Sequence, residues 1–150
     1  MKRLILILLS SLGLVGISYA DDAEAKALEI EALQQQLTET FAREDALKKE
    51  LKELLYLLKS AYINMIAARV RTHWRYQGAK DDWGCTVYVL QDIDGKVEAV
   101  NIRKCNVDDS EKAQHFKNSI ERAVYKASPL PSAPDDAVFD REILFEFVVN

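Results

Sequence analysis

Residues Cys85–Cys105, "CTVYVLQDIDGKVEAVNIRKC", carry the clearest structural pattern of the chain. β-Branched residues and alternation over Thr86–Leu90 and again over Val97–Ile102 are typical of two short β-strands. Between these runs stands Asp94-Gly95, the strongest short-range signal for a tight hairpin turn. The sequence therefore predicts an antiparallel β-hairpin that carries a cysteine near each of its open ends.

Cys85 and Cys105 are the only two cysteines of the chain. Opposed residues of an antiparallel pair have Cα atoms about 4.5 to 5.5 Å apart, within the range that a disulfide requires. Because export would place both thiols in an oxidising compartment, we expect a structural disulfide that closes the mouth of the hairpin. The spacing is not Cys-x-x-Cys and no histidine-rich cluster accompanies it, so we expect neither a redox centre nor a metal site, and no cofactor.

An amphipathic helix is predicted after the hairpin. The segment "DDSEKAQHFKNSIERAVYKAS" opens with helix-start residues and then places apolar residues on one face: Phe116, Ile120, Ala123, Val124 and Ala127. Three prolines within six residues then stop the helix and stiffen the return path: Pro129, Pro131 and Pro134. The final run, "REILFEFVVN", predicts a third strand, with one side formed by Ile143, Phe145, Phe147 and Val149.

We expect the Thr86–Leu90 strand to lie in the centre of the sheet, because a right-handed crossover joins the second strand to the third. The predicted class is α+β: a three-stranded antiparallel sheet packed by two helices and preceded by a long N-terminal helix. The last strand would then form an edge that Glu146 alone protects with a charge. We expect an extended partner segment to add to this edge, the predicted binding residues being Ile143, Leu144, Phe145, Glu146, Phe147 and Val148. The alternative is that the proline segment or the long helix covers the edge.

A long helix is predicted from Asp21 to about Ser60, where strong helix formers dominate and neither proline nor glycine occurs. Apolar residues fill most core positions of a heptad repeat and predict oligomerisation contacts at Ile30, Leu33, Leu37, Leu47, Leu51, Leu54 and Leu58. Thr40 and Glu44 interrupt this series, so a solvated helical spacer is the alternative. The helical pattern continues to Gly78, with an inward stripe expected at Ile63, Ile66, Val70 and Trp74.

The first twenty residues, "MKRLILILLSSLGLVGISYA", have a basic start, a short apolar run and small residues in a cleavage-site arrangement. They predict a signal peptide and a periplasmic protein, with an uncleaved inner-membrane anchor as the alternative. The expected organisation is a signal peptide over 1–20, a helical spacer over 21–60 and a folded domain over 61–150.

Charge and composition weigh against several other classes of function. The formal charge of −4 becomes about −6 once Lys2 and Arg3 are removed with the leader. No basic stripe could neutralise phosphates, so we expect no nucleic-acid partner. His73 and His115 have no nucleophile motif beside them and no phosphate-binding loop exists, so we expect no catalytic residues and no small-molecule substrate.

The order of these elements resembles the C-terminal domain of the TolA family and, more distantly, that of the TonB family. The residues that carry the resemblance are Trp74, Cys85–Leu90, Asp94-Gly95, Cys105, "SIERAVYKASPLP" over Ser119–Pro131, Phe139, Phe145 and Phe147. "AVYKASPLP" is the most specific part. The resemblance covers roughly residues 62–150.

This resemblance implies a non-catalytic interaction module of the cell envelope. Its partners would be TolB and Pal, with colicins and filamentous-phage coat protein as intruders. The chain departs from TolA in having only about forty helical residues ahead of the domain and no histidine in its apolar segment. A homo-oligomeric envelope spacer and a TonB-like module that binds transporters are the alternative functions.

Overall fold

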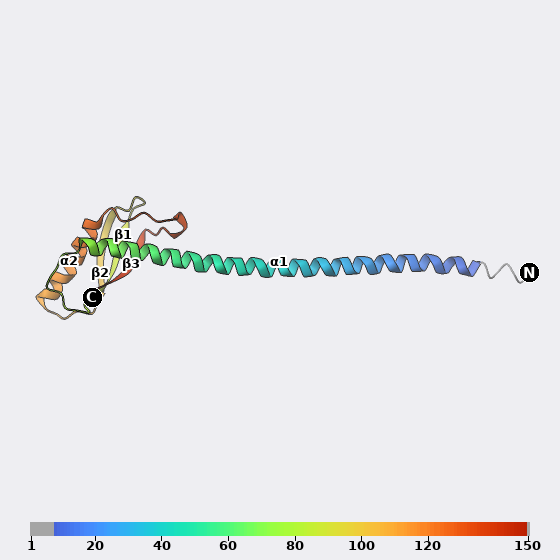
Figure 1. Cartoon of the computed structure of the whole chain (residues 1–150), viewed down its shortest axis with the longest axis horizontal. Coiled ribbons are helices and arrows are strands. Elements are labelled where there is room, and N and C mark those ends of the chain that lie inside the picture. Colours follow the sequence, from blue (N-terminus) through green and yellow to red (C-terminus); the bar gives the residue numbers. More distant parts are fainter. Residues whose placement is uncertain (1–7, 150) are drawn as a thin grey trace, which may run out of the picture. The chain divides into compact units, whose positions relative to one another are not determined.

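The computed structural model describes residues 8–149, with side chains from Asp21 onwards. Its elements in chain order are α1 (Leu8–His73), β1 (Gly84–Gln91), β2 (Val97–Cys105), α2 (Glu111–Ala127), the short 3-10 helix η1 (Asp136–Val138) and β3 (Glu142–Val148) (Figure 1). The chain divides into two units, Met1–Leu51 and Lys52–Asn150. The predicted signal peptide, residues 1–20, lies outside the residues whose side chains the structure describes.

The sheet and its topology confirm the predicted α+β fold. All strands are antiparallel in the order β2-β1-β3, so β1 is central and β3 forms an edge. Val87 of β1 pairs with Ile102 on one side and with Phe145 on the other. The predicted disulfide is present between Cys85 and Cys105, whose Cα atoms lie 4.1 Å apart.

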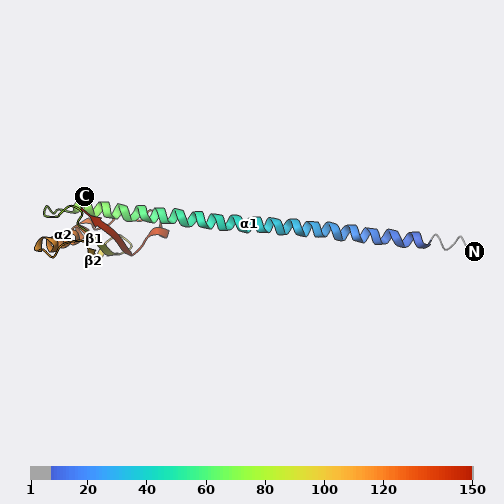
Figure 2. The same cartoon turned by 90° about the horizontal axis from the view of Figure 1, so that it is seen from below.

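Both helices contribute to the core on one face of the sheet. In Figures 1 and 2, α2 lies beside β2 and the last turns of α1 lie beside β3. The buried side chains of the two helices and of the inner sheet face form one cluster, which includes Tyr62, Ile66, Val70, Val87, Val89, Phe116, Ile120, Val124, Ile143, Phe145 and Phe147. Gln91 donates from Nε2 to the Tyr62 hydroxyl (3.1 Å), which ties the end of β1 to α1.

Helix α1 ends at His73, so its predicted extension to Gly78 is wrong. The indole N–H of Trp74 donates to Ser119 Oγ (2.8 Å), and its ring centroid lies 5.2 Å from that of Phe147. These contacts draw the chain into the domain immediately after the last helical turn. The inward stripe of α1 is therefore Tyr62, Ile66 and Val70, whereas Ile63 and Trp74 are only half-buried.

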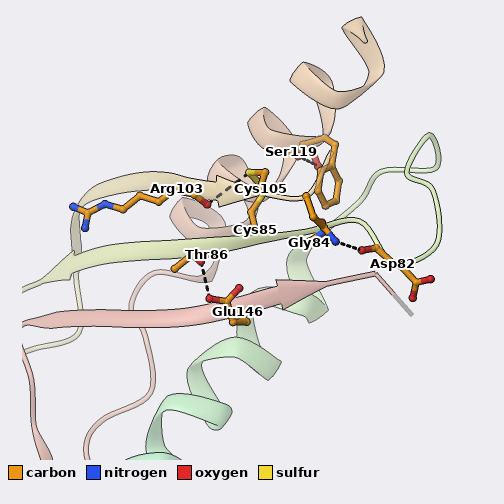
Figure 3. The surroundings of a disulfide bond; sticks show 10 residues. Asp82, Gly84, Cys85, Thr86, Arg103, Cys105, Ser119 and Glu146 are labelled. Carbon is orange, nitrogen blue, oxygen red and sulfur yellow. Dashed lines mark hydrogen bonds between the residues drawn. A yellow bond between two sulfur atoms is a disulfide. The ribbon is translucent and has the colours of Figure 1, made fainter. Parts of the chain in front are cut away.

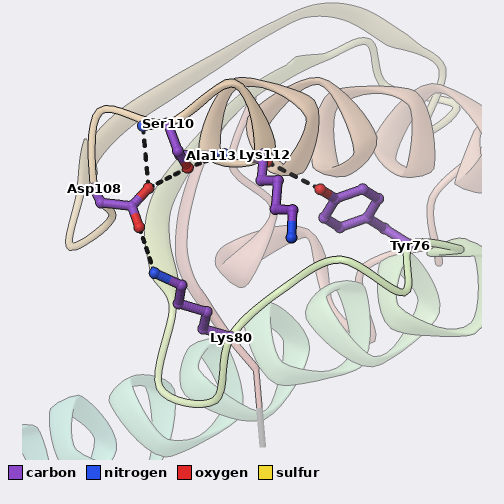
Figure 4. A network of polar contacts seen from close by, with 6 residues as sticks. All are labelled: Tyr76, Lys80, Asp108, Ser110, Lys112 and Ala113. Atoms are coloured by element: carbon purple, nitrogen blue, oxygen red, sulfur yellow. Dashed lines mark hydrogen bonds and ion pairs between the residues drawn. The ribbon is translucent and has the colours of Figure 1, made fainter.

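Helix α2 has its N-cap at Ser110, one of three helix-start candidates in the sequence, the others being Asp108 and Asp109. Ser110 Oγ accepts from the backbone N–H of Ala113 (3.2 Å), and Asp108 accepts from the backbone N–H of Ser110 (3.1 Å). The ammonium of Lys80 also donates to Asp108 (2.6 Å), and this bond, with those from Ser110, lowers the pKa of Asp108 to about 2. Figure 4 shows this network and the nearby hydrogen bond from the Tyr76 hydroxyl to the Lys112 carbonyl (3.0 Å).

The proline segment packs onto the tip of the hairpin. Leu130, between Pro129 and Pro131, is buried, and its N–H donates to the Gly95 carbonyl (2.7 Å). Gly95 has a φ of +80°, and a Cβ there would lie 2.5 Å from the Leu130 carbonyl oxygen. Glycine is therefore required twice at this position, once by the turn and once by the close approach of the proline segment.

Candidate partner-binding edge

The open side of β3 is the candidate site. β1 pairs with one side of β3, and no strand among residues 8–149 pairs with the other. The backbone hydrogen bonds at both ends of the strand fix the direction of every peptide group between them. Gln91 donates from its backbone N–H to the Arg141 carbonyl (3.0 Å), and Val149 donates to the Trp83 carbonyl (2.8 Å).

The direction of the peptide groups alternates along an antiparallel strand. Since Arg141 and Val149 both bond toward β1, the odd-numbered residues between them do so as well. The residues whose N–H and carbonyl groups point to the open side are therefore Glu142, Leu144, Glu146 and Val148. This is the row of groups to which an added strand would bond.

Side chains already occupy the two ends of this row. The N–H of Glu142 donates to Asp140 Oδ1 (3.1 Å), while Arg71 Nη1 donates to the Val148 carbonyl (2.9 Å). Asp140 also accepts a hydrogen bond from Lys59 Nζ (2.9 Å). The bond from Lys59, and to a smaller extent the bond from the Glu142 N–H, hold the pKa of the Asp140 carboxyl below its usual range. The ends of the strand are thus fixed to α1.

The backbone groups between these ends have no partner among the described residues. They are the carbonyls of Glu142, Leu144 and Glu146 and the N–H groups of Leu144, Glu146 and Val148. These six groups form a continuous unpaired row along the edge of the sheet. We call this row, from the Glu142 carbonyl to the Val148 N–H, the open edge.

The predicted binding residues of β3 separate into two sets. The side chains of Ile143, Phe145 and Phe147 are buried in the core and cannot reach a partner. Leu144 is 52% exposed and Glu146 is exposed, both on the outer face of the sheet, and Val148 is half-buried at its end.

The outer face of the sheet is polar around Leu144. Glu146 accepts from the Thr86 hydroxyl (2.6 Å), as Figure 3 shows. Two strands away, the Arg103 guanidinium lies 4.4 Å from the centre of the Tyr88 ring. A shallow hollow of about 310 Å³ lies between these groups and is lined by Thr86, Arg103, Lys104, Leu144 and Glu146.

The disulfide fixes the start of β1 next to the far end of the open edge. Asn106, directly after Cys105, accepts from the N–H of Gly84 and donates to the Asp82 carbonyl (2.8 Å). Figure 3 shows Asp82 and Gly84, the two residues that Asn106 joins, beside the bond between Cys85 and Cys105. The disulfide and the hydrogen bonds of the Asn106 side chain therefore both hold the backbone with which β3 pairs.

The predicted oligomerisation residues lie on α1 with exposed side chains. Their exposed fractions run from 37% to 58% for Ile30, Leu33, Leu37, Leu47, Leu51, Leu54 and Leu58. A helix that presents so many apolar side chains to solvent is typical of a helix with a missing partner.

Sequence reasoning missed Arg71, Lys59 and Asp140, which bound the open edge. Each is a common surface residue, and Lys59 meets Asp140 across 81 positions of sequence. No local pattern marks such a pair.

The described residues show no other candidate centre. No cluster of metal-ligating side chains occurs among residues 21–149, whose side chains the structure describes. His73 Nδ1 lies 2.9 Å from the Arg69 carbonyl of its own helix, and His115 lies 3.5 Å from Glu111. None of the described helices contains a stretch long and apolar enough to cross a membrane.

The profile of a protein family described as TonB C terminal matches residues 59–147. The chain belongs to the TonB C-terminal family. Membership indicates a protein-interaction module of the cell envelope, and domains of this kind are periplasmic. The TonB likeness is thus shown, whereas the closer likeness to TolA stays a prediction.

Among solved structures, the chain is similar to the solution structure of the TonB C-terminal domain of Helicobacter pylori. The two are 14% identical, with 59% of this chain and 89% of the other covered and a TM-score of 0.40. No curated protein is significantly similar to this TonB-family chain in sequence.

Proposed function

We propose that this chain is an exported, non-catalytic module that binds an extended segment of another envelope protein as a fourth strand beside β3. The observation that carries the proposal is the open edge, whose carbonyl and N–H groups have no partner within residues 8–149. An unpaired edge of this kind pairs readily with another chain, because the backbone supplies affinity and alternate side chains supply specificity.

Two partner classes fit the proposal. The likeness to TolA points to TolB-like or Pal-like proteins, with phage coat protein and colicins as intruders. Membership of the TonB C-terminal family supports equally a TonB-like module that binds outer-membrane transporters. In both cases the partner offers an extended segment to the edge, and the open edge suits either.

Site-specific photo-crosslinking tests the proposal in the intact envelope. A photoreactive amino acid replaces Leu144, which is 52% exposed beside the open edge, and in a matched control it replaces Tyr125, which is 45% exposed on α2. We expect an envelope protein to crosslink from position 144 and not from position 125. Mass spectrometry then identifies the crosslinked peptide, which we expect to belong to an extended segment of that protein. Equal crosslinking from both positions, or none from position 144, would contradict binding at this edge.

Self-association through α1 is the second candidate function. The observation that favours it is the exposed heptad stripe, in which Leu47 and Leu51 are each 58% exposed. Two or more chains would bury this stripe in a coiled coil and act as an oligomeric spacer.

A further inference from the structure

The chemistry on both sides of the open edge specifies its occupant. The stripe of α1 that runs alongside β3 consists of Lys59, Ile63, Ala67 and Arg71, four residues apart and so on one side of the helix. Lys59 bonds Asp140 before the start of β3 and Arg71 bonds Val148 at its end. The helix therefore follows the inner side of the edge along its whole length.

The middle of this stripe is apolar. Ile63 and Ala67 are half-buried and pack against the core, which leaves part of each surface uncovered. Next to Ile63 the helix carries a hollow of about 390 Å³, lined by Tyr56, Lys59, Ser60, Ile63 and Asn64. The inward side chains of a fourth strand would lie over this surface, because successive side chains of a strand alternate between the faces of the sheet.

On the outer face, β3 itself carries two carboxylates, while Arg103 and Lys104 of β2 line the hollow beside Glu146. Glu142 and Glu146 flank the exposed Leu144 on the outer face, and neither carboxylate has an ion-pair partner among the described residues. Side chains directly opposite one another on paired strands interact, and opposite charges stabilise the pair. Positive residues would therefore face the two glutamates, and an apolar residue would face Leu144.

We propose, on the basis of the function proposed above, that the partner segment has the pattern basic, apolar, apolar, apolar, basic. The two basic side chains face Glu142 and Glu146, the central apolar side chain faces Leu144, and the other two face Ile63 and Ala67. The pattern is the same in both directions, so it applies to parallel and to antiparallel addition. Asp140 and Arg71 confine the segment to the open edge, because each occupies the backbone group just beyond it.

Two synthetic peptides test this pattern: acetyl-Gly-Lys-Val-Leu-Val-Lys-Gly-amide and the same peptide with glutamate in place of both lysines. Each is titrated into the isotopically labelled full-length protein and followed by NMR. We expect the lysine peptide to shift the amide signals of Leu144, Glu146 and Val148 and to bind at least about fivefold more tightly than the glutamate peptide, a difference within the range of two cross-strand charge pairs.

Charge variants of the protein distinguish specific charge pairs at the open edge from nonspecific attraction to the net charge of the protein. Glu142→Gln with Glu146→Gln should weaken binding of the lysine peptide about fivefold and remove the preference between the peptides. Glu121→Gln with Glu111→Gln, which removes the same charge on α2, should change neither affinity. Equal binding of both peptides to the wild-type edge, or equal effects of the two double variants, would overturn the pattern.

The outcomes also distinguish this inference from the proposed function. If neither peptide shifts the edge signals while position 144 still crosslinks to an envelope protein, the inferred pattern is wrong and strand addition stands. If crosslinking from position 144 fails as well, both are wrong.

Discussion

At the scale of single residues, Arg71 defines one end of the open edge. Its guanidinium donates to the outward carbonyl of Val148 and lies 5.1 Å from the centre of the Phe147 ring. An incoming strand cannot use that carbonyl without displacing a charge-assisted hydrogen bond. Such bonds are stronger than those between neutral groups, so Arg71 limits the length of strand that can pair.

Replacing Arg71 with Met should lengthen the usable edge. The change frees the Val148 carbonyl while keeping an apolar stem near Phe147. The test compares the lysine peptide with a longer form that carries two more alanines at each end. The wild-type protein should bind both peptides equally. Arg71→Met should bind the longer peptide about fivefold more tightly than the shorter one, the scale of one net hydrogen bond. Isothermal titration calorimetry measures both affinities.

The matched control is Arg69→Met, which removes an exposed positive charge from the same helix. It should behave as the wild type. If the longer peptide gains as much affinity for the wild-type protein as for Arg71→Met, then Arg71 does not terminate the edge.

At the scale of elements, the disulfide stabilises the two strands that position β3. It closes a loop of sequence separation 20 between opposed strand ends. Replacing both Cys85 and Cys105 with Ser should lower the free energy of unfolding by about 2 to 5 kcal/mol, because the unfolded chain regains the freedom of that loop. Urea unfolding monitored by tryptophan fluorescence measures the loss.

Reduction of the wild-type protein is the control for that double variant. Both should lose a similar free energy of unfolding if the covalent link is responsible. A loss in the serine variant alone would assign the effect to packing of the buried Cys85 side chain instead.

The elements also show how far sequence patterns reach. The hairpin, α2 and β3 were predictable because turn residues, a helix cap and alternation act over a few neighbouring residues, as at Gly95 and Ser110. The end of α1 could not be predicted in this way, because it depends on the hydrogen bond between Trp74 and Ser119, which are 45 positions apart. The edge strand was predictable from topology, but the closure of its Val148 end depends on Arg71, 77 positions away on α1, and Asp140 at the other end is held by Lys59 of the same helix.

At the scale of the whole molecule, the exposed heptad stripe of α1 predicts self-association. Leu47→Gln with Leu51→Gln should shift the full-length protein toward monomer in sedimentation equilibrium, because both side chains leave the predicted coiled-coil core. Leu28→Gln is the control, since Leu28 is 63% exposed but lies outside the core positions of the heptad. A wild-type protein that stays monomeric at all accessible concentrations would exclude this function.

Backbone N-methylation within β3 tests most directly that a partner adds to the open edge. The N–H of Glu146 points to the open side, whereas that of Phe147 points toward Cys85 in β1. A methyl group on the Glu146 nitrogen, introduced by semisynthesis, should abolish the crosslink from position 144 and leave the circular dichroism spectrum native. The same group on Phe147 should instead destabilise the sheet. Undiminished capture by a natively folded protein methylated at Glu146 would contradict strand addition at this edge.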